Sequence, residues 1–154
     1  MSNQKIDLSS VGEVLRTNPQ VSVLTAGASM RPMLRQHKDI VVIERFDGQL
    51  KKGDVVAYPS ANKKDYTLHR IVRIKKGALI IRGDNNYFTE TNVNMEDIVG
   101  ILKEFYRDGK YINCKTNKGY KLYTKYIILS YPFRFVWVKS LRPFLSKIKR
   151  KILK

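Results

Sequence analysis

The chain is dominated by short runs of β-branched and aliphatic residues, most of them bounded by a turn signal. Seven such runs occupy residues 21–25, 39–44, 54–58, 66–74, 79–82, 98–106 and 110–113. Asp108-Gly109, between the last two runs, is a typical hairpin turn. Because the connections are short and carry no helical pattern, the sequence predicts a mainly β fold with a coiled, antiparallel, barrel-like sheet.

A helix is expected on each side of this β region. Ser10 and Glu13 have the spacing of a capping box ahead of an apolar face, which predicts a short N-terminal helix over residues 10–18. Beyond residue 140, apolar side chains recur at helical spacing among basic ones, which predicts a C-terminal basic helical segment. The apolar positions of that segment are Leu141, Phe144, Leu145, Ile148 and Ile152.

Positive charge is concentrated toward the C-terminus. The 154 residues include 30 Lys and Arg against 13 Asp and Glu, a net charge of +17. Residues 1–108 have a net charge of +4 and contain every acidic residue, whereas residues 109–154 contain 13 Lys and Arg and no acid. We therefore expect one folded domain in residues 1–114, followed by a basic, aromatic-rich amphipathic segment in residues 115–154.

Residues 27–34, Gly-Ala-Ser-Met-Arg-Pro-Met-Leu, can present a nucleophilic serine. The small residues Gly27 and Ala28 let another backbone approach the Ser29 hydroxyl, and Pro32 cannot continue a β-ladder. These features predict that Ser29 lies at the exposed end of a strand. A serine without a base is inert, and an ordinary turn serine is the alternative interpretation.

His69 and Asp84 are the other two candidates for chemistry. His69 lies within the strand-like run 66–74, where an inward-facing ring needs a partner, and Asp84 lies in a Gly-Asp-Asn turn after the next strand. Taken singly, a structural histidine and a turn aspartate are the simpler interpretations. Taken with Ser29, they supply a nucleophile, its base and a group that orients the base. His37 has no such context and is interpreted as a loop residue.

The remaining composition narrows the class of protein. Cys114 is the single cysteine and the two histidines are far apart, so we expect no intrachain disulfide, no metal and no cofactor. The first residues lack the apolar run of a signal peptide. No run approaches the roughly 20 apolar residues that a membrane-spanning helix needs. A cytoplasmic protein is expected.

Four motifs follow one another in the order found in signal peptidases. They are residues 27–34, Gly-Asp-Val-Val at 53–56, Leu-His-Arg-Ile-Val at 68–72 and Gly-Asp-Asn-Asn at 83–86. Over about residues 21–102 the chain resembles the S24/S26 serine peptidase superfamily, and His69 in place of a lysine makes it similar to the archaeal and endoplasmic-reticulum-type branch. The resemblance implies a signal-peptidase-type catalytic domain with Ser29 as nucleophile, His69 as general base and Asp84 as the acid.

Three features depart from that branch. A second aspartate often follows the Gly-Asp-Asn motif there, whereas the nearest acid here is Glu90. Gly27 stands where the family usually has a serine that helps to stabilise the oxyanion, so backbone N–H groups such as that of Ser29 are expected to serve instead. Membrane-bound relatives also carry an N-terminal transmembrane helix, which this sequence lacks.

The C-terminal segment combines an aromatic-rich apolar block at residues 126–138, interrupted at Pro132, with the basic amphipathic pattern beyond it. This combination is typical of a segment that lies in the membrane interface and is attracted to anionic lipid. One alternative is a helix packed on the β domain with a solvated basic edge. The other is nucleic-acid binding, which the lack of a recognisable reading motif disfavours.

Together these features predict a serine endopeptidase that removes a leader or signal-like segment from a precursor bound as an extended strand. We expect it in the cytoplasm, peripherally associated with the inner face of the membrane. The alternative is a catalytically inactive relative that keeps the fold and binds a peptide or the membrane.

Overall fold

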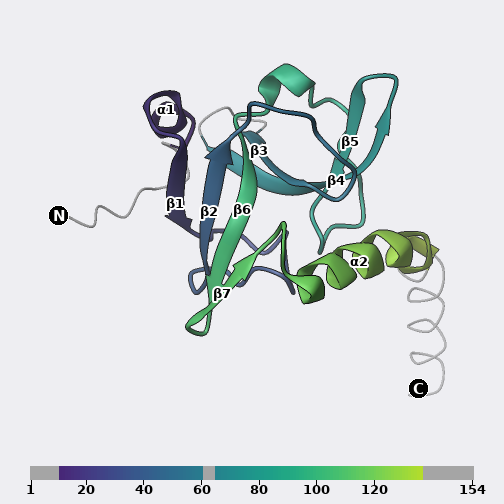
Figure 1. Ribbon diagram of the computed structural model, residues 1–154. Coiled ribbons are helices and arrows are strands. Elements are labelled where there is room, and N and C mark those ends of the chain that lie inside the picture. The colour runs from purple at the N-terminus through teal and green to yellow at the C-terminus, as the bar shows by residue number, and fades with distance from the viewer. Residues whose placement is uncertain (1–10, 61–64, 137–154) are drawn as a thin grey trace, which may run out of the picture.

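The computed structural model describes residues 11–60 and 65–136 of the chain (Figure 1). Its main feature is one antiparallel sheet of seven strands, which confirms the predicted mainly β, antiparallel fold. Each of the seven runs identified in the sequence forms a strand. The strands are β1 (Gln20–Leu24), β2 (Ile40–Arg45), β3 (Val55–Pro59), β4 (Tyr66–Lys75), β5 (Ala78–Arg82), β6 (Gly100–Arg107) and β7 (Lys110–Asn113).

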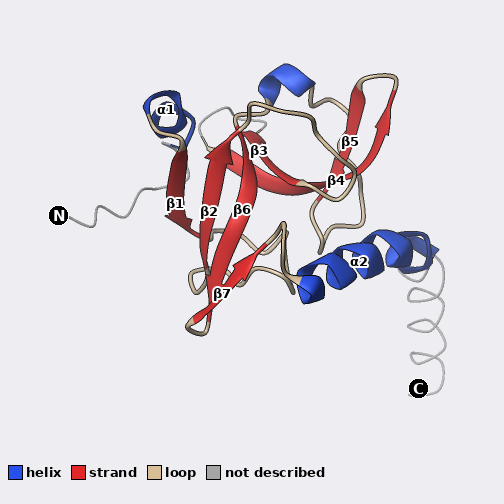
Figure 2. Cartoon of the chain, in the orientation of Figure 1, coloured by secondary structure: helices blue, strands red, loops and turns tan. Residues whose placement is uncertain are grey.

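The sheet is strongly curved but not closed into a barrel. The strand order is β1-β2-β6-β3-β4-β5, and β7 pairs with β6. One edge of β6 pairs with β2, while the other pairs first with β3 and then with β7. The register shifts between Val42 and Ile43 and again between Ile71 and Arg73, and such irregularities bend a sheet. The result is the coiled sheet that Figure 2 shows in red.

Strand β3 is buried on both of its faces. Val55 and Ala57 belong to one apolar cluster, and Val56 and Tyr58 belong to a second. Successive residues of a strand point to opposite faces, so β3 separates the two clusters. The first cluster also contains Met30, Met33 and Leu34, and it therefore supports the loop that carries Ser29.

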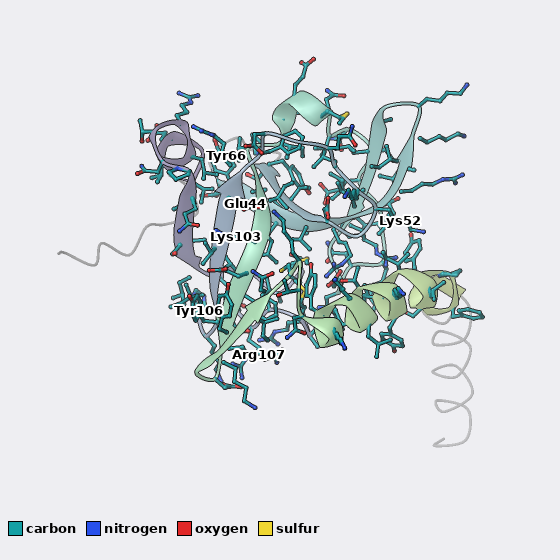
Figure 3. All side chains as sticks on the ribbon, viewed as in Figure 1. Glu44, Lys52, Tyr66, Lys103, Tyr106 and Arg107 are labelled. Atoms are coloured by element: carbon teal, nitrogen blue, oxygen red, sulfur yellow. The ribbon has the colours of Figure 1, made fainter. Side chains whose placement is uncertain are left out.

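Helix α1 (Val11–Thr17) packs at the β1 end of the sheet, with Val11 and Leu15 buried. It agrees with the helix expected over residues 10–18, of which residue 10 lies outside the described residues. A Cβ atom at Gly12 would lie only 1.8 Å from the Tyr66 hydroxyl oxygen, so a larger residue would have to displace the Tyr66 ring where the helix meets the start of β4. Figure 3 shows Tyr66 beside α1.

Helix α2 (Lys118–Val136) lies along one side of the sheet (Figure 2). No sequence pattern predicted the first two turns of α2, and the helix continues through Pro132, where an interruption was expected. The basic helical pattern over residues 141–152 lies outside the described residues. In the part of the chain that is described, neither helix combines the length and the apolar character needed to span a membrane. A short 3₁₀ helix, η2 (Met95–Asp97), lies between β5 and β6.

Candidate functional site

Ser29 lies in the loop between β1 and β2, whose base is closed by Thr25. The Thr25 N–H donates to the Asp39 carbonyl oxygen at 3.0 Å, and the Thr25 hydroxyl donates to the Arg35 carbonyl oxygen at 2.6 Å. The Arg35 guanidinium in turn binds the buried Asp39 carboxylate, with Nη2 2.6 Å from Oδ1. Gly27 enters the loop with a φ of 75°, a conformation that favours glycine. The half-buried Ser29 is thus carried by a loop that is pinned at its base.

The far side of the same loop is held by Arg107 at the end of β6. Its Nη1 donates to the carbonyl oxygens of Pro32 at 3.0 Å and Met33 at 3.2 Å. The peptide bond between Arg31 and Pro32 is cis. Figure 3 places Arg107 near the junction of the sheet with the start of α2. Residues 27–34 are therefore fixed to the sheet from two directions.

The turn at residues 83–86 joins Ser29 to His69. The Asn85 N–H donates to the Ser29 carbonyl oxygen at 2.7 Å, and the Asn85 side-chain amide donates to the Ala28 carbonyl oxygen at 3.2 Å. A Cβ atom on Gly83 would lie 2.7 Å from the Ser29 carbonyl oxygen and 2.9 Å from His69 Nε2. The Ser29 main chain and the His69 ring therefore approach the same point, and only a glycine leaves room for both.

Tyr58 and Glu90 hold the imidazole of His69 in one orientation. Nδ1 of His69 lies 2.9 Å from Glu90 Oε1 and 2.8 Å from the Tyr58 hydroxyl, which donates to Glu90 Oε2 at 2.8 Å. A carboxylate only accepts hydrogen bonds, so Nδ1 carries the ring proton and Nε2 keeps its lone pair. Nε2 is buried and has no hydrogen-bond partner among the described residues. A ring in this state is prepared to accept a proton at Nε2.

The surroundings of His69 favour its neutral form. Burial is the largest influence and lowers the pKa of His69 below its usual value, while the negative charges of Glu90 and Asp84 oppose this shift. Burial and Glu90 both raise the pKa of Tyr58, so its hydroxyl stays protonated and can donate to Glu90. At neutral pH the site therefore holds a neutral imidazole.

Asp84 has a different position from the one expected. Its carboxylate forms a two-point contact with Arg70, whose Nε lies 2.8 Å from Oδ1 and whose Nη2 lies 2.8 Å from Oδ2. Both side chains are buried. Neither ring nitrogen of His69 is hydrogen-bonded to Asp84, and the side chain set against the ring is Glu90. Asp84 is thus paired with Arg70, and Glu90 is the acid that contacts the His69 ring.

The sequence contained a weak signal for Glu90. It is the first acid after Asp84, in the region where the related branch often has a second aspartate. What places it is a two-residue β-bridge, in which Ile81 and Glu90 exchange N–H to carbonyl hydrogen bonds of 2.9 and 2.8 Å. This bridge brings Glu90 beside β5 and directs its carboxylate to Tyr58 and His69.

Arg70 connects this site to α2. Besides Asp84, its Nη1 donates to the carbonyl oxygen of Gly53 at 2.8 Å and to Thr124 Oγ1 at 3.1 Å. The Tyr123 hydroxyl donates to Asp84 Oδ2 at 3.1 Å. The Arg70–Asp84 pair consequently joins β4, the 83–86 turn and α2 in one buried polar network, directly behind His69.

A cavity of about 440 Å³ opens beside Ser29. Strand β5 pairs with β4 only from Arg70 to Lys75, so it does not cover the first half of β4, where the cavity lies. Residues 25–30 line one side of the cavity and residues 65–68 line the other. Both segments are long enough to lie alongside an extended chain. Its lining residues are Thr25, Ala26, Gly27, Ser29, Met30, Leu34, Ser60, Asp65, Tyr66, Thr67 and Leu68.

The structure also shows the surroundings of Gly27, His37 and Cys114, which were singled out from the sequence. Within the described ranges, the Ser29 N–H donates no hydrogen bond. A Cβ atom placed on Gly27 would meet no atom within 4 Å. His37 is an exposed loop residue, as the sequence predicted. Its Nε2 lies 3.0 Å from the Gln36 amide nitrogen. Burial raises the pKa of the free Cys114 thiol to about 12, so this cysteine is a poor nucleophile.

Comparison with known proteins bears on the family of this chain. No protein-family model matches the chain. The signal peptidase complex catalytic subunit SEC11 of Clavispora lusitaniae (strain ATCC 42720) is 27% identical over 122 residues, which cover 71% of this chain and 72% of that protein. This match confirms the resemblance inferred from the four motifs. The similarity supports a place in the signal peptidase I-like family, in its archaeal and endoplasmic-reticulum-type branch.

Proposed function

We propose that this protein is a serine endopeptidase that removes a leader or signal-like segment from a precursor, with Ser29 as nucleophile and His69 as general base. The observation that supports this most directly is the meeting of the Ser29 main chain and His69 Nε2 at Gly83. A buried ring nitrogen that has no partner in the described chain is costly unless a hydroxyl or a substrate satisfies it. In this proposal the Ser29 hydroxyl becomes that partner when the substrate binds.

The reaction follows from these positions. Nε2 of His69 takes the Ser29 hydroxyl proton as Oγ attacks the carbonyl carbon of the scissile peptide, and the resulting tetrahedral intermediate carries an oxyanion. When the intermediate collapses, the protonated Nε2 gives that proton to the leaving amine, and the acyl group stays on Oγ. Water then attacks the ester with His69 again as base, which releases the acid product and restores Ser29.

Glu90 and Tyr58 serve the base in this scheme. Their contacts with Nδ1 keep the proton on that nitrogen, and the Glu90 charge stabilises the imidazolium formed after proton transfer. The N–H of Ser29 is the candidate donor to the oxyanion, since Gly27 has no hydroxyl to offer. Asp84, assigned to the site from the motifs, acts at one remove, because it fixes Arg70 and the turn that holds Ser29.

The cavity beside Ser29 indicates how a substrate binds. An extended chain placed between residues 25–29 and the first half of β4 can form backbone hydrogen bonds on both sides. Ala26, Met30 and Leu68 give the cavity an apolar lining, which favours small apolar side chains near the scissile bond. A precursor with a signal-type leader is consistent with the SEC11 relative, which is named as the catalytic subunit of a signal peptidase complex.

Association with a membrane is also part of the proposal. The relative is a subunit of a signal peptidase complex, and residues 115–154 of this chain carry the excess of positive charge. We assign these residues to an anionic membrane surface, at which the β domain of residues 1–114 acts as a peripheral peptidase.

Labelling with a fluorophosphonate probe tests the chemistry. The wild-type protein should be labelled at Ser29, and both Ser29→Ala and His69→Ala should lose labelling and cleavage of a leader peptide to a similar extent, because the two residues act as a unit. Ser9 or Ser22 substitutions serve as controls for other serines of the chain. Absence of labelling in a wild-type protein that still binds the peptide would support the inactive relative instead.

A further inference from the structure

The outer face of α2 carries a continuous apolar stripe. Leu122, Tyr126, Leu129 and Phe133 follow one another at intervals of four, three and four residues, and their exposed fractions are 70%, 63%, 71% and 77%. This spacing places them on one face of a helix, over a length of about 16 Å at 1.5 Å per residue. Single exposed apolar residues are ordinary, but a line of four large ones marks a binding surface.

The opposite face of α2 is committed to the β domain. Ile127 is 2% exposed, the Thr124 hydroxyl accepts from Arg70, and the Tyr123 hydroxyl donates to Asp84. These directional bonds fix the rotation of the helix about its own axis. The stripe therefore cannot turn inward without breaking a buried polar network, and its four side chains stay exposed.

Charge decides what the stripe can bind. Helix α2 contains no acidic residue, and the exposed Lys118 and Lys125 each precede a stripe leucine by four residues. Lys121 lies three residues from Lys118 and four from Lys125, so the three lysines share one flank of the stripe. A second copy packed along the stripe would bring these lysines together without an acid to pair them. Residues 137–154 carry seven Lys and Arg and no acid, so they repel this face as well.

We propose that the stripe of Leu122, Tyr126, Leu129 and Phe133 is the surface by which this protein binds an anionic lipid bilayer. The helix lies parallel to the bilayer, with the apolar side chains among the upper acyl chains and the lysines at the level of the anionic headgroups. Long lysine side chains reach that level from the flank of a buried face. This assignment deepens the proposed membrane association and rests on it, but it does not depend on catalysis.

Vesicle sedimentation tests the assignment, using full-length wild-type protein and the Ser29→Ala variant in parallel. Both should bind vesicles of mixed phosphatidylglycerol and phosphatidylcholine, and bind pure phosphatidylcholine at least about tenfold more weakly. The triple variant Leu122→Gln/Leu129→Gln/Phe133→Gln should lose binding by at least about tenfold, since glutamine preserves helix formation while removing the apolar contact. Phe88→Gln, which changes a 66% exposed residue outside α2, should bind like the wild type.

A second pair of variants isolates the charge. Lys118→Gln/Lys121→Gln/Lys125→Gln should weaken binding to anionic vesicles and reduce its sensitivity to salt. Lys52→Gln/Lys75→Gln/Lys76→Gln removes the same charge from exposed positions of the β domain and should change binding much less. Equal losses in both sets would overturn the role of α2, because binding would then follow net charge alone.

Three further outcomes would overturn the proposal. The first is a wild-type protein that does not sediment with anionic vesicles. The second is a dimer in analytical ultracentrifugation that the stripe variant converts to a monomer, which would assign the stripe to a second copy. The third is a large fall in Tm of the stripe variant, which would mean that the chain covers the stripe itself. Loss of peptide cleavage with vesicle binding intact would instead contradict the proposed peptidase function alone.

Discussion

Glu90 Oε1 lies 2.9 Å from His69 Nδ1, at the opposite ring nitrogen from the one that faces Gly83 and the Ser29 main chain. The two residues are brought together by the Ile81–Glu90 bridge, and the Tyr58 hydroxyl joins them in a closed set of three contacts. This arrangement gives His69 a fixed tautomer and a counter-charge. It predicts that Glu90 is the acid whose substitution slows the reaction.

Glu90→Gln should lower kcat while leaving the fold intact. The change removes the negative charge that stabilises the imidazolium, but the Tyr58 hydroxyl can still accept a hydrogen bond from Nδ1. We therefore expect a loss of about 10²- to 10³-fold, less than the ~10⁴-fold that follows when a triad loses its tautomer. The measurement is the initial rate of leader-peptide cleavage at saturating substrate. Glu96→Gln, an exposed change in η2, is the control, and equal rates for the two variants would contradict the assignment.

The pH dependence of kcat/KM should show an acidic limb below pH 6.5. The base must be neutral to accept a proton, and burial lowers the pKa of His69 from its usual value of 6.5. Glu90→Gln should move this limb to still lower pH, because it removes the charge that opposes the effect of burial. A wild-type limb above pH 7 would contradict a buried histidine base.

Stability should follow the same titration. Between the lowered pKa of folded His69 and 6.5, the unfolded chain binds more protons than the folded one, so the free energy of unfolding rises with pH in this window. This contribution is complete above pH 6.5 and is lost as the pH falls below that value. The measurement is the Tm of the wild type and of His69→Gln across this pH range. The variant should lack the rise in Tm with pH that the wild type owes to His69.

Asp84→Asn should act mainly on stability. It leaves the buried Arg70 guanidinium without its counter-charge, which we expect to cost about 3 kcal/mol and to lower Tm by about 10 °C. Asp108→Asn is the matched control, because its partner Arg35 is near the surface and its loss should leave Tm almost unchanged. A variant with normal Tm and strongly reduced turnover would restore Asp84 to the role that the motif resemblance implies.

Gly83→Ala should reduce cleavage by at least about 10²-fold. The added methyl group would lie 2.7 Å from the Ser29 carbonyl oxygen and 2.9 Å from His69 Nε2, so one of the two must move. A misplacement of about 1 Å between reacting groups can lower the rate by about 10²-fold. Gly48→Ala is the control, because a Cβ there meets nothing within 4 Å. Full activity of Gly83→Ala would mean that Ser29 and His69 do not meet at this point.

The strands, helix α1 and the family resemblance could be predicted from the sequence because they depend on local patterns. Strand positions follow from runs of β-branched residues and from turns, which is why all seven strands and α1 were predicted. The family was also accessible, since its motifs are short and keep their order. Whether a curved sheet closes was not, because closure depends on pairing between its end strands β1 and β5, which no local pattern encodes.

Tertiary structure alone decided the partners of the charged residues and the role of α2. Glu90 reaches His69 through the isolated bridge between Ile81 and Glu90, which no local pattern of residues marks. Arg70 pairs with Asp84 because burial favours a two-point ion pair between them. Helix α2 is apolar on two opposite faces, one packed on the domain and one exposed, so its sequence shows no single hydrophobic side. Hydrophobic periodicity detects a helix with one apolar face. A helix with apolar residues on two opposite faces gives no such signal, and its packed and exposed faces can be told apart only in the tertiary structure.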